Sequence, residues 1–186
     1  MKEDSIAKAE QDKVIGEITF GVSEKEFEKR RNEFLKQTEY IEVVTVSGYE
    51  FKGNRIGSYR FDRLQGRYHN DNLYFTRIIG SSIHYEKYDS ELKPEAQSIY
   101  NIFTKDKYGL PSEENIIPEW HRLQKGYYYT FAIWEVGTKT IKLSIQDNGI
   151  YHKINVDIFR PEIENFLKNI EENKMQDAER RATDLI

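Results

Sequence analysis

The chain has 186 residues, of which 32% are charged and 13% aromatic, and its formal net charge is −4. This length can bury a substantial core, and the aromatic content is unlike that of a disordered chain. The absence of cysteine excludes disulfides and thiolate metal sites, and the mild acidity argues against a nucleic-acid partner, which usually faces a basic surface.

The N-terminal segment 1–13 is polar and is predicted to lie outside the folded domain. Its sequence, MKEDSIAKAEQDK, contains no hydrophobic stretch and therefore no secretory signal. A cytoplasmic location is expected for the chain as given, and a cell-envelope location if an export signal has been removed. No apolar run approaches the roughly 18 residues that a membrane-spanning helix needs.

The first part of the domain is predicted to contain a strand, a helix and a hairpin. Val14–Phe20 has the composition of a strand, and Ser23 and Glu26 have the spacing of a capping box that opens a helix over 24–36. Gly53 lies in a predicted turn over 51–54. Further strands are predicted from β-branched and aromatic composition over 41–46, 58–68 and 73–79, with a bulge at Gly66.

The second part repeats this order. Pro94 is tolerable only in the first turn of a helix, and Gly109 supplies a left-handed cap, so a helix is predicted between them. A long loop over 112–124 precedes an aromatic strand, 127–136. A hairpin follows over 138–159: Ile141, Leu143 and Ile145 alternate with polar residues, Asn148-Gly149 favours a tight turn, and apolar residues resume at Ile150, His152, Ile154, Val156 and Ile158.

Pro161 begins a predicted amphipathic helix with an apolar stripe, and 176–186 reads as a polar helical tail. We therefore predict an α+β fold with an antiparallel sheet, built from two helix-plus-three-strand halves and the C-terminal amphipathic helix. A single domain spans 14–175, with halves at about 14–80 and 81–160. The similar order of elements indicates a possible internal repeat, although chance similarity is the more favoured interpretation.

Two short motifs carry a resemblance to a known group. Phe20-Gly21-Val22-Ser23 precedes the first helix, and Tyr108-Gly109-Leu110-Pro111 follows the second. In this respect the chain resembles small bacterial proteins with a helix followed by a three-stranded sheet, such as the β-lactamase-inhibitor-protein repeat and the small outer-membrane assembly lipoproteins. The resemblance implies a non-enzymatic protein that binds other proteins. The lipid-anchoring cysteine of the lipoproteins is absent here.

Catalytic and metal-binding patterns are not found in the sequence. None of the four histidines stands in HxxxH or HExxH spacing, and no phosphate-binding or nucleophile motif occurs. Glu119 and His121 are the one conceivable acid–base pair, but neighbouring loop positions define no geometry. We therefore predict no cofactor, no metal site and no catalytic residue, and an enzyme is the less favoured reading.

The aromatic residues near the centre of the second half are the candidate binding site. A sheet face made by Trp120, Tyr127, Tyr129 and Trp134 would offer large contact area to a protein partner. Core packing, with amphipathic tyrosines at the rim of the sheet, is the more favoured interpretation of these rings. We expect an interaction module that contacts another protein, or itself, through this face or the C-terminal helix. The second hypothesis is a small-molecule-binding protein or enzyme with a pocket between the two halves.

Overall fold

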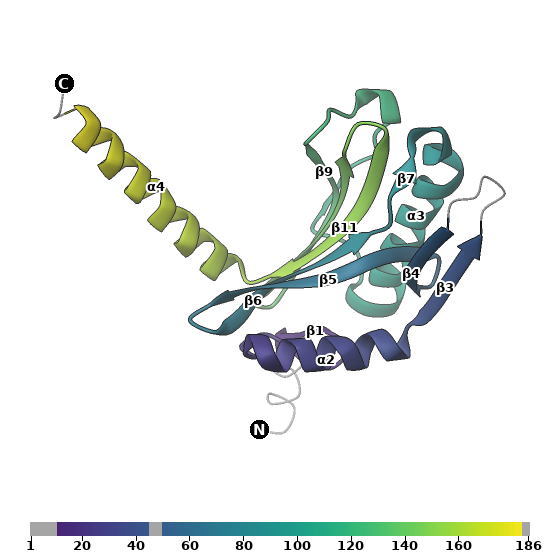
Figure 1. Ribbon diagram of the computed structural model, residues 1–186, viewed down its shortest axis with the longest axis horizontal. Coiled ribbons are helices and arrows are strands. Elements are labelled where there is room, and N and C mark those ends of the chain that lie inside the picture. Colours follow the sequence, from purple (N-terminus) through teal and green to yellow (C-terminus); the bar gives the residue numbers. More distant parts are fainter. Residues whose placement is uncertain (1–10, 45–49, 184–186) are drawn as a thin grey trace.

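The structure, a computed structural model, describes residues 11–44 and 50–183 and shows a curved sheet flanked by helices (Figure 1). Its strands are β1 (Lys13–Ile15), β2 (Ile18–Thr19), β3 (Glu39–Val44), β4 (Glu50–Ile56), β5 (Tyr59–His69), β6 (Asn72–Gly80), β7 (Ile83–His84), β8 (Glu113–Glu114), β9 (Tyr128–Val136), β10 (Lys139–Asp147) and β11 (Tyr151–Phe159). Its α-helices are α2 (Glu24–Gln37), α3 (Lys93–Asn101) and α4 (Pro161–Thr183).

Shorter helical segments complete the described chain. The π-helices η2 (Tyr88–Leu92) and η3 (Ile102–Tyr108) extend α3 at both ends, and Gly109, with φ +76°, ends this run where the sequence predicts a stop. The 3₁₀ turns are η1 (Tyr85–Lys87) and η4 (Trp120–Arg122). The second predicted helix is therefore present, although only its centre has α-helical geometry.

The large sheet is antiparallel and has the strand order β3-β4-β5-β6-β11-β10-β9-β8, with β7 paired to β11 beside this path. The strands β6 and β11 pair at its centre, where Ile78 lies opposite Val156. The predicted fold class, an α+β fold with an antiparallel sheet and a C-terminal helix, is confirmed. An origin of the two parts by duplication stays a prediction.

One face of the sheet forms the core. On β10, Ile141 and Leu143 are buried, and they pair with Ile158 and Val156 of β11, so these side chains point the same way. The helices α2 and α3 bury Phe27 and Ile99 in the same cluster. Both helices therefore cover the same face of the sheet.

The start of α2 follows from its sequence. The Ser23 hydroxyl accepts a hydrogen bond from the backbone N–H of Glu26 at 3.3 Å, which is one of the two bonds of the predicted capping box, while the Glu26 carboxylate accepts from Arg30 at 2.8 Å. Phe27 is buried, and Phe34 and Leu35 pack partly against the core. The helix predicted over 24–36 is thus confirmed, one residue longer at its end.

Three local predictions in the first half are wrong. The segment 14–20 forms two short strands, because Gly16, with φ +54°, turns the chain between them. The predicted turn over 51–54 lies inside β4, and the chain turns instead at Gly57, with φ +59°. The register shifts of β5 lie between Phe61 and Arg63 and between Arg67 and Tyr68, so Gly66 is not itself the bulge. Residues 45 and 46 of one predicted strand lie outside the described residues.

The hairpin over 138–159 is confirmed, but its turn differs from the prediction. Three residues, Asn148 to Ile150, separate β10 from β11, and among them only Gly149 has a positive φ, +93°. The type I′ turn that Asn-Gly favours would need positive φ at both central residues. In this longer loop Ile150 is exposed, whereas the sequence pattern places it on the apolar side with Ile154.

The helix α4 begins at Pro161 as predicted and extends away from the sheet (Figure 1). Near its start, the ring of Phe166 lies 5.9 Å from that of His69, and Glu164 lies 3.6 Å from Arg67. All residues from 171 to 176 are exposed. The helix continues through residue 176 to Thr183, so the predicted polar tail is helical as far as it is described.

Candidate functional site

Trp134, one of the four aromatic residues predicted to form a binding face, lies in the hydrophobic core. It is 1% exposed, and its Nε1 donates to the carbonyl oxygen of Gly109 at 2.9 Å. Its ring packs edge-on against Phe103 at a centroid distance of 5.7 Å. Trp134 pairs with Ile141 and therefore points to the core face of the sheet. It supports the fold from inside and is not on a surface.

The other three predicted residues have different surroundings. Trp120, on η4, is 43% exposed and its ring lies 5.5 Å from that of Tyr85. Tyr127 is 62% exposed, whereas Tyr129 is half-buried and its hydroxyl donates to the carbonyl oxygen of Arg122 at 3.5 Å. Trp120 and Tyr127 are therefore the two that present broad ring area to solvent. The binding role of these residues stays a prediction.

The face of the sheet opposite the core carries an arginine held between a carboxylate and two rings. The Nε and Nη2 groups of Arg77 donate to the two oxygens of Asp157, both at 2.6 Å, and this hydrogen bonding raises the pKa of Arg77. Its guanidinium lies 5.0 Å from the ring centroid of Tyr128 and 5.5 Å from that of Phe75. Because its charge is already paired, Arg77 is better suited to rigidify this face than to bind an anion.

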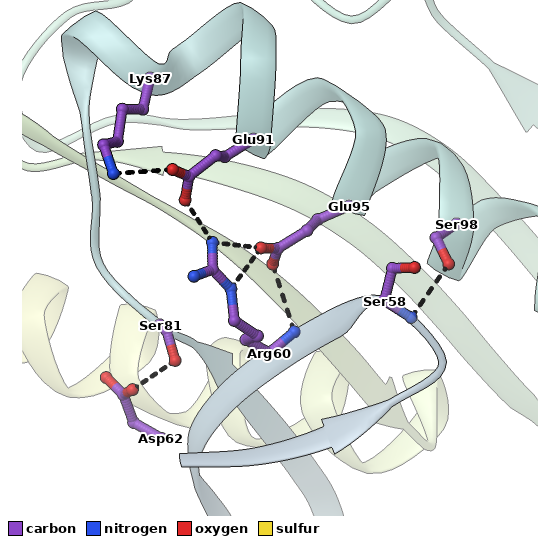
Figure 2. A network of polar contacts seen from close by, with 8 residues as sticks. All are labelled: Ser58, Arg60, Asp62, Ser81, Lys87, Glu91, Glu95 and Ser98. Carbon is purple, nitrogen blue, oxygen red and sulfur yellow. Dashed lines mark hydrogen bonds and ion pairs between the residues drawn. The ribbon is translucent and has the colours of Figure 1, made fainter. Parts of the chain in front are cut away.

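A second charged network joins the helical segment to β5 (Figure 2). Arg60 donates through Nε to Glu95 at 2.5 Å and through Nη2 to Glu91 at 2.7 Å, and Lys87 binds Glu91 at 2.8 Å. Burial raises the pKa of Glu95 despite the nearby charge of Arg60. Partial burial opposes ionisation of Glu91 as well, but hydrogen bonds from Lys87 and Arg60 lower its pKa overall. Each carboxylate has a cationic partner, so the network connects elements rather than offering a free base.

A buried histidine lies near the loop end of β11. His152 places Nε2 at 3.4 Å from Oδ1 of Asp147, and its ring lies 5.1 Å from that of Tyr88. Burial lowers the pKa of His152, and its Nδ1 has no hydrogen-bond partner within the described residues. The arrangement favours a neutral imidazole enclosed by the fold.

The conceivable acid–base pair of Glu119 and His121 does not assemble. Both carboxylate oxygens of Glu119 accept from Lys93, at 2.9 and 3.0 Å, whereas His121 is exposed beside the ring of Trp120. Across residues 11–44 and 50–183, no group of three or more His, Asp or Glu side chains could hold a metal ion.

An apolar cavity of about 260 Å³ lies between the two helical segments, on the core face of the sheet. The end of α2 contributes Phe34, η3 contributes Ile102 and Phe103, and the floor includes Ile78 and Ile158 from the two central strands. In the part of the chain that the structure describes, its charged wall residues are three lysines, Lys13, Lys107 and Lys139. Two further cavities, of about 370 and 380 Å³, are lined largely by polar side chains.

Sequence reasoning did not identify these three lysines. The sequence around each lysine is typical of a surface position. The three lysines are separated by 94 and 32 positions in the chain (107 − 13 and 139 − 107). Only the packing of β1, η3 and β10 around one cavity brings them together. No local spacing rule could have indicated such a site.

Comparison with protein-family models, curated proteins and solved structures gives no match for this chain. The resemblance to helix-plus-three-strand binding proteins therefore stays a prediction. In the described ranges, no helix combines the length and apolarity needed to cross a membrane.

Proposed function

We propose that this protein is a non-enzymatic interaction module that contacts another protein through α4. The observation that carries this proposal is the exposure of large apolar side chains on a helix that extends away from the sheet (Figure 1). Phe166 is 54% exposed and Met175 is 64% exposed. Contiguous apolar surface left in water is typical of surfaces that bind other molecules, and Phe166 belongs to such a stripe, whereas Met175, nine residues later, lies on the opposite side of the helix.

The stripe on α4 has the spacing of a helix that docks into a groove. Ile163, Phe166, Leu167 and Ile170 recur at intervals of three and four residues and so share one face. Ile163, Leu167 and Ile170 are half-buried. A partner that covers this face would remove their remaining apolar area from water, and the favourable free energy scales with that area. Trp120 and Tyr127 are the candidate second contact.

The proposal is tested by affinity capture, in which the immobilised full chain retains binding proteins from a lysate. Wild type is compared with two matched variants. Phe166→Ser with Ile170→Ser removes the stripe, and Asn165→Ser with Asn169→Ser changes exposed positions on the same helix. A defined protein retained by wild type and by the asparagine variant, but lost by the stripe variant, would support the proposal. Retention by all three chains, or by none, would reject it.

The solution mass separates a foreign partner from self-association. If α4 binds a second copy, wild type has a particle mass of two chains by light scattering and the stripe variant a mass of one. Truncation after Lys174 removes the end of the helix and tests whether the part beyond the stripe contributes. A wild-type mass of one chain would exclude self-association at the concentration measured.

The cavity favours a second candidate function, a small-molecule-binding protein. Ligand sites are mostly apolar concavities with a few polar groups that fix orientation, and the cavity between the helical segments has this composition. A bound ligand stabilises the folded state by mass action. A thermal-shift screen of metabolites would support this function if an apolar compound raises Tm in a saturable way, and would reject it if none does.

A further inference from the structure

We infer that the cavity between α2, η3 and the sheet binds an amphiphile with an apolar chain and an anionic head group. This inference rests on the second candidate function, because it names the ligand class of the same cavity. It is independent of the proposed role of α4, which lies outside the cavity walls.

The walls of the cavity suit an apolar chain. Ile78, Ile99 and Ile158 are buried and form the inner surface, while Phe34, Ile102 and Phe103 are half-buried and carry the apolar lining outward. The volume of about 260 Å³ lies just below the roughly 300–1,000 Å³ that is usual for drug-sized ligands. A slender hydrocarbon chain fits this space better than a large ring system.

The charged groups that the described residues contribute to the wall are all of one sign. The exposed Lys107 places a cation where the cavity meets the surface, and Lys13, on β1, is a half-buried residue of the same wall. Neither lysine forms an ion pair in the part of the chain that the structure describes. Among residues 11–44 and 50–183, no acidic side chain lines the wall. On a protein of net charge −4, this local composition favours an anion.

Lys139 adds a positioned cation. Its side chain is buried, its Nζ donates to the carbonyl oxygen of Lys13 at 2.7 Å, and it lies 5.2 Å from the ring centroid of Tyr108. These contacts hold the ammonium group beside the cavity with part of its hydration replaced. A cation in such surroundings interacts with a nearby anion more strongly than one in bulk water.

The geometry of η3 brings apolar and cationic groups to one wall. In a π-helix the backbone bonds join residues five apart, whereas an α-helix joins residues four apart. Ile102 and Lys107 are five residues apart in η3, and both line the cavity. The π-helical segment therefore presents an apolar side chain and a cation to the same space, as an amphiphile requires.

The test uses isothermal titration calorimetry on the full chain with four probes, each below its aggregation concentration. Decanoate and decyl phosphate carry anionic heads of different chemistry, decanol is a neutral control, and decyltrimethylammonium is a cationic one. We expect both anions to bind at least about tenfold more tightly than decanol, because an anionic head group forms charge-assisted hydrogen bonds with the wall lysines that are stronger than those of a neutral hydroxyl. The ratio of the two anions identifies the preferred head group.

Two matched variants locate the site. Lys107→Glu reverses a wall cation, and Lys105→Glu reverses an exposed cation of the same segment that is not in the wall. We expect Lys107→Glu to weaken decanoate binding by about fivefold or more and Lys105→Glu by less than about twofold. Both positions are exposed, so neither substitution removes core packing.

A second readout follows occupancy directly. Trp120→Phe leaves Trp134 as the single tryptophan, and its ring touches Phe103 of the cavity wall. We expect decanoate to change its fluorescence with the dissociation constant measured by calorimetry.

Each outcome separates the inference from the function on which it rests. Tighter binding of the anions, weakened selectively by Lys107→Glu, supports the inference. Equal binding of decanol and decanoate overturns anion recognition but leaves a small-molecule-binding function. Equal effects of the two glutamate variants overturn the placement of the head group. Absence of binding by all four probes overturns the inference and counts against the second candidate function.

Discussion

His152 connects the protonation of one residue to the stability of the fold. Its folded-state pKa lies below the ordinary value of 6.5, chiefly because burial disfavours the charged imidazole, with Asp147 opposing and His84 adding to this effect. The unfolded chain therefore binds more protons as the pH falls below 6.5. The stability that the neutral histidine contributes is present above this pH and is lost as the pH falls toward the folded-state pKa.

Lowering the pH from 7.5 to 5.5 should reduce the free energy of unfolding of wild type, and we expect this reduction to be smaller in His152→Leu. Asp147 keeps its hydrogen bond from the backbone N–H of Gly149, at 2.6 Å, so the leucine leaves that carboxylate with a partner. The measurement is the urea midpoint at both pH values and constant ionic strength. His121→Leu, at an exposed position, is the control and should retain the wild-type loss. An unchanged loss in His152→Leu would show that this residue is not the linked group.

Gly80 is required by a close approach of two strands rather than by its backbone angle. A Cβ atom on this residue would lie 2.3 Å from the carbonyl oxygen of Ile154 on β11. Backbone cannot move away as a flexible side chain can. We expect Gly80→Ala to lower the free energy of unfolding by about 1–3 kcal/mol or more, measured by urea denaturation. Ser82→Ala, two residues later, is the control, and an equal effect of both would contradict this explanation.

At the scale of elements, a few polar contacts fix how the second helical segment lies on the sheet. Glu95 on α3 accepts from both the side chain and the backbone N–H of Arg60 on β5, at 2.5 and 3.2 Å (Figure 2). The buried carboxylate and the backbone group satisfy each other, so removal of either leaves a desolvated partner.

We expect Glu95→Ala to destabilise the fold by about 2 kcal/mol, because Arg60 loses its most buried partner but keeps Glu91. Glu91→Ala should cost less than about 1 kcal/mol, because that side chain is partly exposed. Urea denaturation of both variants measures the difference. If Glu91→Ala proved the more damaging of the two, the network would not be held by its buried member.

Helices were predicted more accurately than turns at this scale. The capping box at Ser23 and the stop at Gly109 are local signals, complete within a few residues, and both predict correctly. Gly53 and Gly66 are also typical of turns and bulges. In the structure both lie within strands, where other side chains or backbone approach them closely. The sequence does not distinguish a glycine that is required because other atoms approach it closely from a glycine that is required by the backbone angles of a turn.

At the scale of the whole molecule, the two predicted halves share one sheet. The central pair of β6 and β11 joins them, and the Tyr59 hydroxyl of the first half donates to the carbonyl oxygen of Ile154 in the second, at 2.9 Å. Each half alone would expose one edge of a central strand together with its buried apolar face.

We therefore expect that neither fragment 14–80 nor fragment 81–160 folds alone. Each should give a narrow amide spectrum by NMR, whereas an equimolar mixture should recover dispersed resonances if the fragments reassemble. The intact chain serves as the reference. A well-dispersed spectrum from either isolated fragment would show that it forms an independent domain.

The sequence alone determined the fold class, because alternation with a period of two and capping signals are written into short stretches of chain. It also determined the apolar stripe of α4 and the core side of β10 and β11. It grouped Trp134 with Trp120, Tyr127 and Tyr129 as candidate contacts, because the pattern of a strand does not show which of its two faces other elements cover.

Only the tertiary structure decided which groups meet. It placed Trp134 inside the core beneath η3, committed Glu119 to Lys93, and brought Lys13, Lys107 and Lys139 around one apolar cavity. These juxtapositions depend on the order in which strands pair across the sheet and on which of its faces the helices cover. Contacts between positions far apart in the chain are determined by the packing of the whole molecule, so a local sequence pattern does not predict them.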